Sequence, residues 1–201
     1  MFVPVILAHP DPASLNAALA LAAADALVAA GHATVLHDLC AEGFDPLLPV
    51  DEIPRGSELP APIRDNCAEL ARADGLVVVH PNWWGMPPAV LTGWVDRVFR
   101  PGLAYAFEAT DSGEGVPRPM LALRAVVVLN TANTFPEREA AVFGDPLERI
   151  WRDCVFGLCS RAAFYRRTFA VVCTSTPAQR AQWLAEAARL VTEAFPPEPL
   201  P

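Results

Sequence analysis

The sequence predicts an α/β domain with a doubly wound parallel sheet, and three observations support this prediction. Five short apolar segments alternate along the chain with longer Ala- and Leu-rich segments of helical periodicity. One apolar segment, residues 75–79, is continuous, as expected of a strand that is covered on both faces. Polar or aromatic residues directly follow three of the apolar segments. Alternating strands and helices favour a parallel sheet between two layers of helices.

The elements can be assigned in order along the chain. The expected strands are residues 2–8, 33–39, 75–79, 121–129 and 163–173. The expected helices are residues 15–30, 63–73, 87 or 88 to 99, 145–158 and 177–195. Ser14, Asp145 and either Ser175 or Thr176 are suitable N-caps, because their side chains accept hydrogen bonds from the first helical turn. Gly31 suits the position after the first helix.

Five such strand–helix units in 201 residues fit a flavodoxin-like, five-stranded order better than a six-stranded dinucleotide-binding domain. We expect a single domain over residues 1–195, followed by a proline-rich tail at 196–201. Residues 40–62 are expected to be irregular, and 51–62 to be the least ordered part. Residues 101–120 form a second long connection.

Composition excludes several classes of protein. Hydrophobic residues make up 53% and charged residues 19%, which is typical of a globular protein. The net charge of -8 and the lack of a basic cluster argue against nucleic-acid binding. Five cysteines without a C-x-x-C pair indicate reduced thiols in the cytoplasm and give no metal site. We expect neither a signal peptide nor membrane insertion.

The first of the three strand-end loops, residues 9–16, leads into a helix N-terminus, where free N–H groups favour a phosphate. Its lack of glycine disfavours a dinucleotide or nucleoside-triphosphate motif. His9, Ser14 and Asn16 could donate hydrogen bonds there. The alternative is that Ser14 is only a cap and His9 only ends a strand.

The second loop, residues 81–87, contains adjacent tryptophans, Trp83 and Trp84. Adjacent residues after a strand point in different directions, so at least one of the two should face solvent or a ligand. A flat aromatic surface beside backbone amides suits a flavin ring, although both tryptophans could instead be core residues. The third loop, residues 130–134, offers polar groups for the same ligand.

Three segments resemble the flavodoxin-like NAD(P)H:quinone oxidoreductase family, the DT-diaphorase type with its bacterial relatives. They are residues 8–16 (AHPDPASLN), 81–99 (PNWWGMPPAVLTGWVDRVF) and 102–107 (GLAYAF). The resemblance covers most of the chain. It implies a homodimer that binds FMN or FAD non-covalently and takes a hydride from NAD(P)H. A quinone or similar small electrophile would then receive the two electrons in a ping-pong reaction.

The resemblance also implies roles for particular residues. Those that would hold the flavin phosphate are His9, Ser14, Leu15 through its N–H, and Asn16. Those that would line the isoalloxazine ring are Pro81, Asn82, Trp83, Trp84 and Gly85. Those that would approach its other edge are Asn130, Thr131, Ala132 and Asn133. The catalytic pocket would be formed by Trp84 together with Tyr105 and Phe107 of a neighbouring subunit.

The chain departs from the family pattern at two places. The segment 130–133 lacks the family's second glycine, and no Tyr and His follow it to relay charge. The connection at 51–62 is shorter than in members that hold an adenine there, so FMN and FAD both stay open. Two other functions also stay open: a flavin-binding ancillary subunit of a potassium-efflux-type membrane system, and a one-electron flavodoxin carrier.

Overall fold

The computed structural model describes residues 1–107, 115 and 117–197. Its main sheet has five parallel strands in the order β2-β1-β3-β6-β7. Their bounds are β1 Val5–Leu7, β2 Leu36–Asp38, β3 Gly75–Pro81, β6 Ala125–Ala132 and β7 Ala163–Ala170. The chain passes from β1 to β2 and then returns to β3 on the other side of β1, so the switch point lies between β1 and β3. The predicted doubly wound, five-stranded sheet is confirmed.

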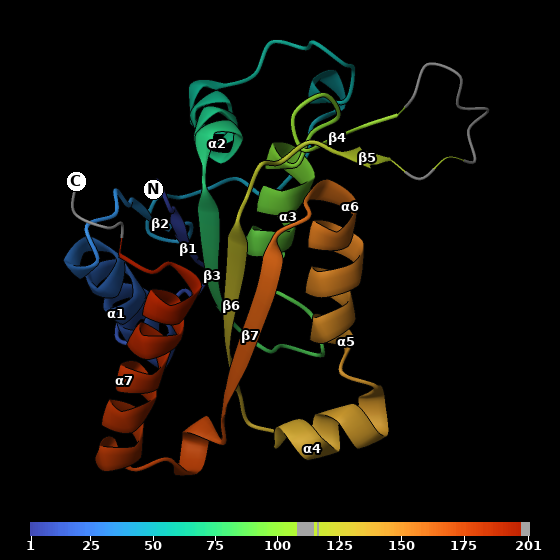
Figure 1. The fold of residues 1–201 in the computed structure, drawn as a ribbon. Coiled ribbons are helices and arrows are strands. Elements are labelled where there is room, and N and C mark those ends of the chain that lie inside the picture. Colours follow the sequence, from blue (N-terminus) through green and yellow to red (C-terminus); the bar gives the residue numbers. More distant parts are fainter. Residues whose placement is uncertain (108–114, 116, 198–201) are drawn as a thin grey trace.

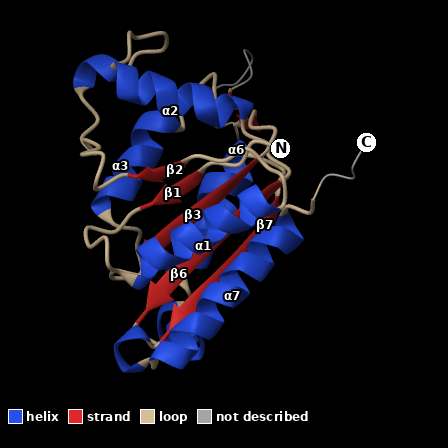
Figure 2. Cartoon of the chain, turned by 90° about the vertical axis from the view of Figure 1, so that its left-hand side faces the viewer, coloured by secondary structure: helices blue, strands red, loops and turns tan. Residues whose placement is uncertain are grey.

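Helices cover both faces of this sheet (Figures 1 and 2). One face packs against α1 (Leu15–Ala29) and α7 (Pro177–Ala194), which lie together in front of the sheet in Figure 2. The other face packs against α2 (Ala61–Arg72), α3 (Ala89–Val98) and a continuous helical stretch of α5 (Pro146–Glu148), η3 (Arg149–Phe156) and α6 (Gly157–Cys159). No helix among the described residues is long and apolar enough to cross a bilayer.

Alternation along the central strands builds the two cores. Leu76 and Val78 of β3 point to the α3 side, whereas Val77 and Val79 point to the α1 side, and all four are fully buried. The predicted helix caps are also confirmed. Ser14 Oγ accepts a hydrogen bond from the N–H of Ala17 at 3.1 Å, and Asp145 and Thr176 cap their helices in the same way.

Several element boundaries differ from the sequence prediction, and two of these differences concern the last two strands of the sheet. The fourth strand of the sheet, β6, runs over 125–132 and not 121–129, because its ladder with β3 continues through the pairs His80–Asn130 and Pro81–Thr131. Asn130 and Thr131 are therefore strand residues and not loop residues. Residues 163–173 also divide into β7 and a short 3-10 turn, η4 (Val172–Thr174).

One residue of the segment expected to be least ordered, Glu52, is fixed to the core. It lies in η1 (Val50–Glu52) and is 2% exposed. The guanidinium of Arg97 on α3 donates to both carboxylate oxygens of Glu52, at 3.1 and 2.5 Å. This ion pair fixes Glu52 to α3, while residues 53–60 form no helix or strand, as the sequence predicted.

Two further elements were not predicted. A short antiparallel hairpin joins β4 (Tyr105–Ala106) to β5 (Arg118–Pro119) within the second long connection. A helical segment, α4 (Pro136–Arg138) and the π-helical turn η2 (Glu139–Phe143), lies between β6 and α5. Most of the predicted tail at 196–201 lies outside the described residues.

Candidate functional site

The loops at the carboxyl edge of the sheet surround two adjoining cavities. In Figure 1 this edge of the sheet lies near α4 and the start of α7. The α1 cavity has a volume of about 460 Å³ and is lined by His9, Asp11, Ala13, Ser14, Leu15, Asn16, Pro81, Asn82, Trp83, Thr131, Ala132, Asn133, Thr134, Val172 and Arg180. The Trp84 cavity has a volume of about 520 Å³ and is lined by Asn82, Trp84, Gly85, Ala132, Asn133, Thr134, Glu139, Phe143 and Pro146. Four residues line both cavities and join them at the sheet edge: Asn82, Ala132, Asn133 and Thr134.

The α1 cavity can bind an anion. The N–H groups of Leu15 and Asn16 open the first turn of α1 and have no partner among the described residues. Arg180 of α7 lines the same cavity, with its Nε donating to Ser175 Oγ at 2.8 Å and one terminal nitrogen donating to the carbonyl of Val172. A helix N-terminus and a guanidinium together suit a phosphate group.

Asn16 and Thr131 support the floor of this cavity. Asn16 is 3% exposed, and its Nδ2 donates to Thr131 Oγ1 at 2.9 Å. The hydroxyl of Thr131 lies 3.2 Å from Asn16 Oδ1 and donates back to it. The two side chains thus tie α1 to β6, so Asn16 offers the cavity its N–H and not its amide side chain.

His9 and Trp83 border the α1 cavity on the β1 and β3 sides. The His9 ring is held by a hydrogen bond in which its Nδ1 accepts from the N–H of Asp11 at 3.0 Å. The ring centroids of His9 and Trp83 lie 5.9 Å apart, with the planes inclined at 55°. Trp83 is 43% exposed, so the prediction that at least one of the paired tryptophans leaves the core is confirmed.

A tight turn presents Trp84. Trp83 and Met86 exchange backbone hydrogen bonds at 3.2 and 2.9 Å, and between them Trp84 and Gly85 have φ angles of 59° and 74°. Two successive left-handed residues define a type I′ turn. Asn82 stabilises the turn by accepting from the N–H of Gly85 at 3.0 Å. Trp84 is 96% exposed, and a tryptophan in this backbone region is strained, which is typical of a functional position.

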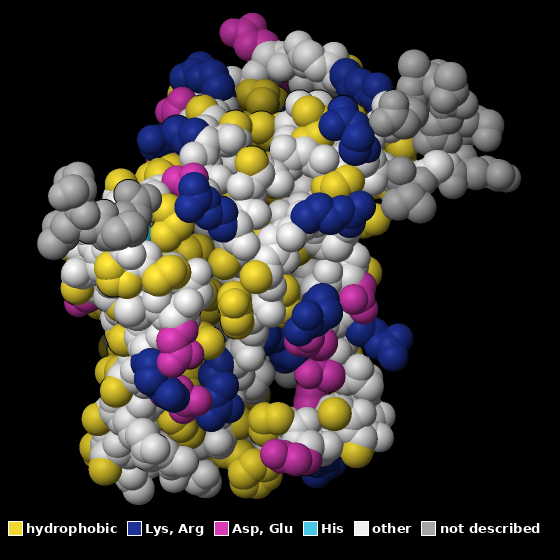
Figure 3. Space-filling view, in the orientation of Figure 1, with side chains coloured by type: hydrophobic (Ala, Val, Ile, Leu, Met, Phe, Trp, Pro, Cys, Tyr) yellow, Lys and Arg dark blue, Asp and Glu magenta, His cyan; other side chains and the backbone are white. Residues whose placement is uncertain are grey.

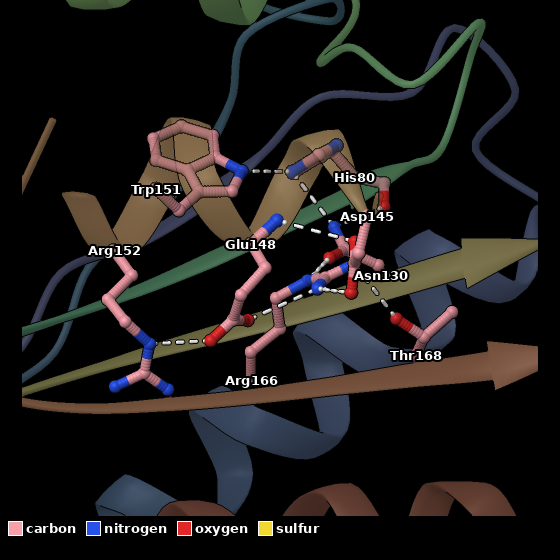
Figure 4. Close-up of polar contacts among 8 residues, drawn as sticks. All are labelled: His80, Asn130, Asp145, Glu148, Trp151, Arg152, Arg166 and Thr168. Atoms are coloured by element: carbon pink, nitrogen blue, oxygen red, sulfur yellow. Dashed lines mark hydrogen bonds and ion pairs between the residues drawn. The ribbon is translucent and has the colours of Figure 1, made fainter. Parts of the chain in front are cut away.

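Asn130 is the one proposed flavin contact that lines neither cavity. Its side chain is fully buried on the α3 side of the sheet, where its Nδ2 donates to Nε2 of His80 at 2.9 Å (Figure 4). Its Oδ1 accepts from Arg166 Nε at 2.7 Å, and Arg166 also pairs with Asp145 at 2.7 Å. The Asn130 side chain therefore supports the site from the α3 side of the sheet and does not approach the position proposed for the flavin ring.

His80 is the centre of this buried network. Trp151 Nε1 donates to its Nε2 at 2.9 Å, so Nε2 accepts two hydrogen bonds, and Nδ1 donates to the carbonyl of Pro81 at 2.8 Å. This arrangement requires a neutral imidazole. Burial lowers the pKa of His80 to about 4, the hydrogen bond to the Pro81 carbonyl opposes this shift, and the charge of Arg166 adds to it.

Tyr105 and Phe107 lie apart from the other proposed site residues. They line a third cavity of about 550 Å³, together with Val95, Asp96, Phe99, Gly115, Pro117, Cys154, Val155, Leu158 and Cys159. Their rings pack edge to face, with centroids 5.8 Å apart. Within one chain they do not share a cavity with Trp84.

The distribution of charged and metal-ligating side chains limits the kinds of ligand that the site can bind. On the face drawn in Figure 3, basic side chains are spread out, with acidic ones among them. Among the described residues, no group of three or more His, Cys, Asp or Glu is placed to hold a metal ion. The site thus offers an anion-binding end and an aromatic end, joined at the switch point of the sheet.

Comparison with known proteins agrees with this geometry. A family model described as the flavodoxin-like fold matches residues 1–191. The chain belongs to this family. A ribosyldihydronicotinamide dehydrogenase-like protein of Penicillium crustosum is 30% identical over 191 residues, covering 82% of this chain and 68% of that protein. NAD(P)H dehydrogenase (quinone) 1 of Cavia porcellus is 32% identical over 124 residues, covering 52% of this chain and 45% of that protein. The chain thus matches less than half the length of the Cavia protein.

Solved structures of other proteins share this architecture. An NAD(P)H:quinone oxidoreductase from Methanothermobacter marburgensis superposes with a TM-score of 0.80 at 25% identity, covering 95% of each chain. An FMN-dependent NADH-azoreductase from Bacillus anthracis, solved with FMN, has a TM-score of 0.72 at 12% identity and covers 96% of this chain and 98% of its own. At that identity the second likeness concerns the fold alone.

Five lining residues lie outside the three loops that the sequence predicted: Glu139, Phe143, Pro146, Val172 and Arg180. Arg180 could have been found, since it lies in the first turn of a helix whose start was expected at the same sheet edge. Glu139 and Phe143 belong to η2, a short segment without a clear periodic pattern, so no local signal placed them at the site.

Proposed function

We propose that this protein is a flavin-dependent oxidoreductase that oxidises NAD(P)H and reduces quinones or similar small electrophiles. The observation that supports this most directly is the junction of the two cavities at the β1–β3 switch point. One end suits a phosphate and the other a flat aromatic ring, which is how a flavin nucleotide is divided. Relatives named as NAD(P)H and ribosyldihydronicotinamide dehydrogenases favour the same activity.

The phosphate would be held by the N–H groups of Leu15 and Asn16 and by Arg180. The ring would lie against the turn at Trp83, Trp84 and Gly85 and against Ala132 and Asn133 of the neighbouring strand end. A bound flavin supplies the hydride chemistry. The protein positions the nicotinamide, and then the acceptor, in the Trp84 cavity and limits the access of water there.

We also propose that the working unit is a homodimer. Trp84 is 96% exposed and so makes little contact with its own chain, while Tyr105 and Phe107 line a cavity elsewhere on the molecule. A second copy that brought its Tyr105 and Phe107 over Trp84 would enclose the acceptor pocket. Sedimentation equilibrium should give a dimer, and Phe107→Glu should shift it toward monomer. A wild-type monomer at working concentrations would contradict this arrangement.

The cellular setting follows from the cysteines. All five are free thiols, which supports a reducing compartment, and we propose the cytoplasm. The comparisons give no support to the alternative of an ancillary subunit of a potassium-efflux system. The relatives described above are instead named for dehydrogenase activity.

A flavin titration of two arginine variants tests the site. Both Arg180 and Arg189 lie on α7, but only Arg180 lines the α1 cavity, and Arg189 pairs at the surface with Glu193 at 3.9 Å. Arg180→Met should weaken FMN or FAD binding by about tenfold or more, because a charge-assisted contact to phosphate is lost. Arg189→Met should leave the affinity unchanged. Equal affinities in all three proteins would contradict the placement of the phosphate, and mass spectrometry of the released cofactor would identify the flavin.

A further inference from the structure

A carboxylate without a protein partner faces the Trp84 cavity. Glu139, in the first turn of η2, is 8% exposed and lines that cavity. Its carboxylate makes no hydrogen bond or ion pair with any described residue. Among the described residues, the oxygens of Glu139 are not among the polar atoms that are both fully enclosed and without a hydrogen-bond partner. Since they have no such partner, they must be exposed to the solvent of the cavity.

The backbone holds Glu139 firmly in this position. Its N–H donates to the carbonyl of Phe135 at 3.0 Å, and its own carbonyl accepts from Asp145 at 3.4 Å. Most of the side chain is buried, while the carboxylate meets the solvent of the cavity without a protein partner. A charged group placed in this way on the wall of a binding cavity indicates a role toward the ligand.

Glu139 also dominates the local charge. Of the described residues that line the Trp84 cavity, it alone is ionisable. Arg180 lies in the α1 cavity, where the proposed phosphate would neutralise it. Arg166, behind the cavity wall, is already paired with Asp145 and Glu148. Among the described residues, no cationic side chain lines the Trp84 cavity to offset the charge of Glu139.

We propose that Glu139 selects the acceptor by charge: the Trp84 cavity takes neutral or cationic electrophiles and excludes anionic ones. This inference rests on the proposed function, since it assumes that acceptors bind in that cavity. A carboxylate repels an anionic acceptor at close range through a low-dielectric wall, while it leaves a neutral quinone of the same shape almost unaffected. Glu139 is thus a specificity-determining residue for the acceptor.

A matched pair of naphthoquinones tests this proposal in the flavin-loaded protein. The probes are 2-methyl-1,4-naphthoquinone, which is neutral, and 1,4-naphthoquinone-2-sulfonate, which is anionic. Their dissociation constants are measured by quenching of flavin fluorescence, and their kcat/KM values by steady-state kinetics. Glu139→Gln keeps the shape and removes the charge, and it should improve sulfonate binding relative to the neutral quinone by about tenfold.

Two variants serve as controls. Glu137→Gln removes the same charge from an exposed position two residues away, and Glu139→Asp keeps the charge in the cavity. Both should leave the ratio of the two affinities within about twofold of the wild type. Glu137→Gln removes only an exposed charge, which solvent screens, and Glu139→Asp keeps the charge in the cavity. In the wild type, added salt should narrow the discrimination, which provides a test that does not depend on the folding of any variant.

Two outcomes would overturn the proposal. An unchanged affinity ratio in Glu139→Gln, or a wild-type ratio that does not respond to salt, would show that Glu139 does not select by charge, while the proposed oxidoreductase function would stand. Failure of the wild-type protein to bind FMN or FAD would instead overturn the proposed function, and the inference with it.

Discussion

Titration of His80 should make the stability of this protein depend on pH. His80 is fully buried, and its Nε2 accepts hydrogen bonds from both Trp151 and Asn130, so the folded protein holds it neutral (Figure 4). Its pKa falls from 6.5 to about 4 in the folded state. Each unit of such a shift corresponds to about 1.4 kcal/mol, so the full effect is roughly 3 kcal/mol.

The direction of the effect follows from proton binding. Between pH 6.5 and about 4 the unfolded chain binds a proton at His80 and the folded chain does not. Stability therefore rises with pH across this window. The contribution of His80 is fully present above pH 6.5 and is lost as the pH falls toward 4. Below that value the folded state must protonate a nitrogen that faces two donors.

Urea denaturation of the wild type and of His80→Gln, between pH 4 and pH 7.5, measures this contribution. The variant loses the titrating group, so its free energy of unfolding should fall less between pH 7 and pH 4, by roughly 3 kcal/mol. The variant will be less stable at pH 7 because its hydrogen bonds are perturbed, so the informative quantity is the difference between the two slopes. Parallel curves for the two proteins would refute the neutral, buried state of His80.

Three further predictions concern the site and its support. Trp84→Asn should raise the free energy of unfolding by about 0.5–1 kcal/mol in thermal melts, because asparagine tolerates the left-handed backbone of this exposed residue. The same variant should weaken flavin binding in a titration, and a loss of stability would contradict the strain argument. Gly85→Ala should destabilise more than Gly102→Ala, since both have positive φ but only at Gly85 does an added Cβ meet a neighbour, at 3.1 Å. Equal losses in chemical denaturation would show that this contact is unimportant. Glu52→Gln should cost about 3 kcal/mol or more by leaving Arg97 buried without its charge partner, and a change below about 1 kcal/mol would show that the pair is solvated.

Local signals predicted much of the site from the sequence. The sequence predicts Ser14 as a helix cap because its side chain can accept a hydrogen bond from the adjacent helical turn. The structure confirms this, since the acceptor and the donor, Ala17, are only three residues apart. The place of Trp83 and Trp84 after a buried strand predicted that at least one of them would be exposed, and both are. Such features depend on neighbours in sequence, so a single chain is enough to infer them.

Features that depend on distant parts of the chain could not be predicted. The direction of Asn130 follows from the extension of β6 through residue 132, because the alternation of side chains along the strand then includes Asn130. Arg180 reaches the α1 cavity from the last helix, and Glu139 from a short π-helical turn. The buried position of Glu52 depends on Arg97, which pairs with it across 45 positions in sequence. Charge pairs of this kind leave no periodic pattern.

The central claim, that the two adjoining cavities hold one flavin that passes electrons from NAD(P)H to an acceptor, is tested most directly by half-reactions without oxygen. Protein loaded with FMN or FAD is mixed with NADH or NADPH in a stopped-flow instrument, and then with a quinone. The account predicts that the visible absorbance of the flavin bleaches with the first reagent and returns with the second. A bound flavin that neither reagent changes, or a flavin that the protein does not bind, would contradict it.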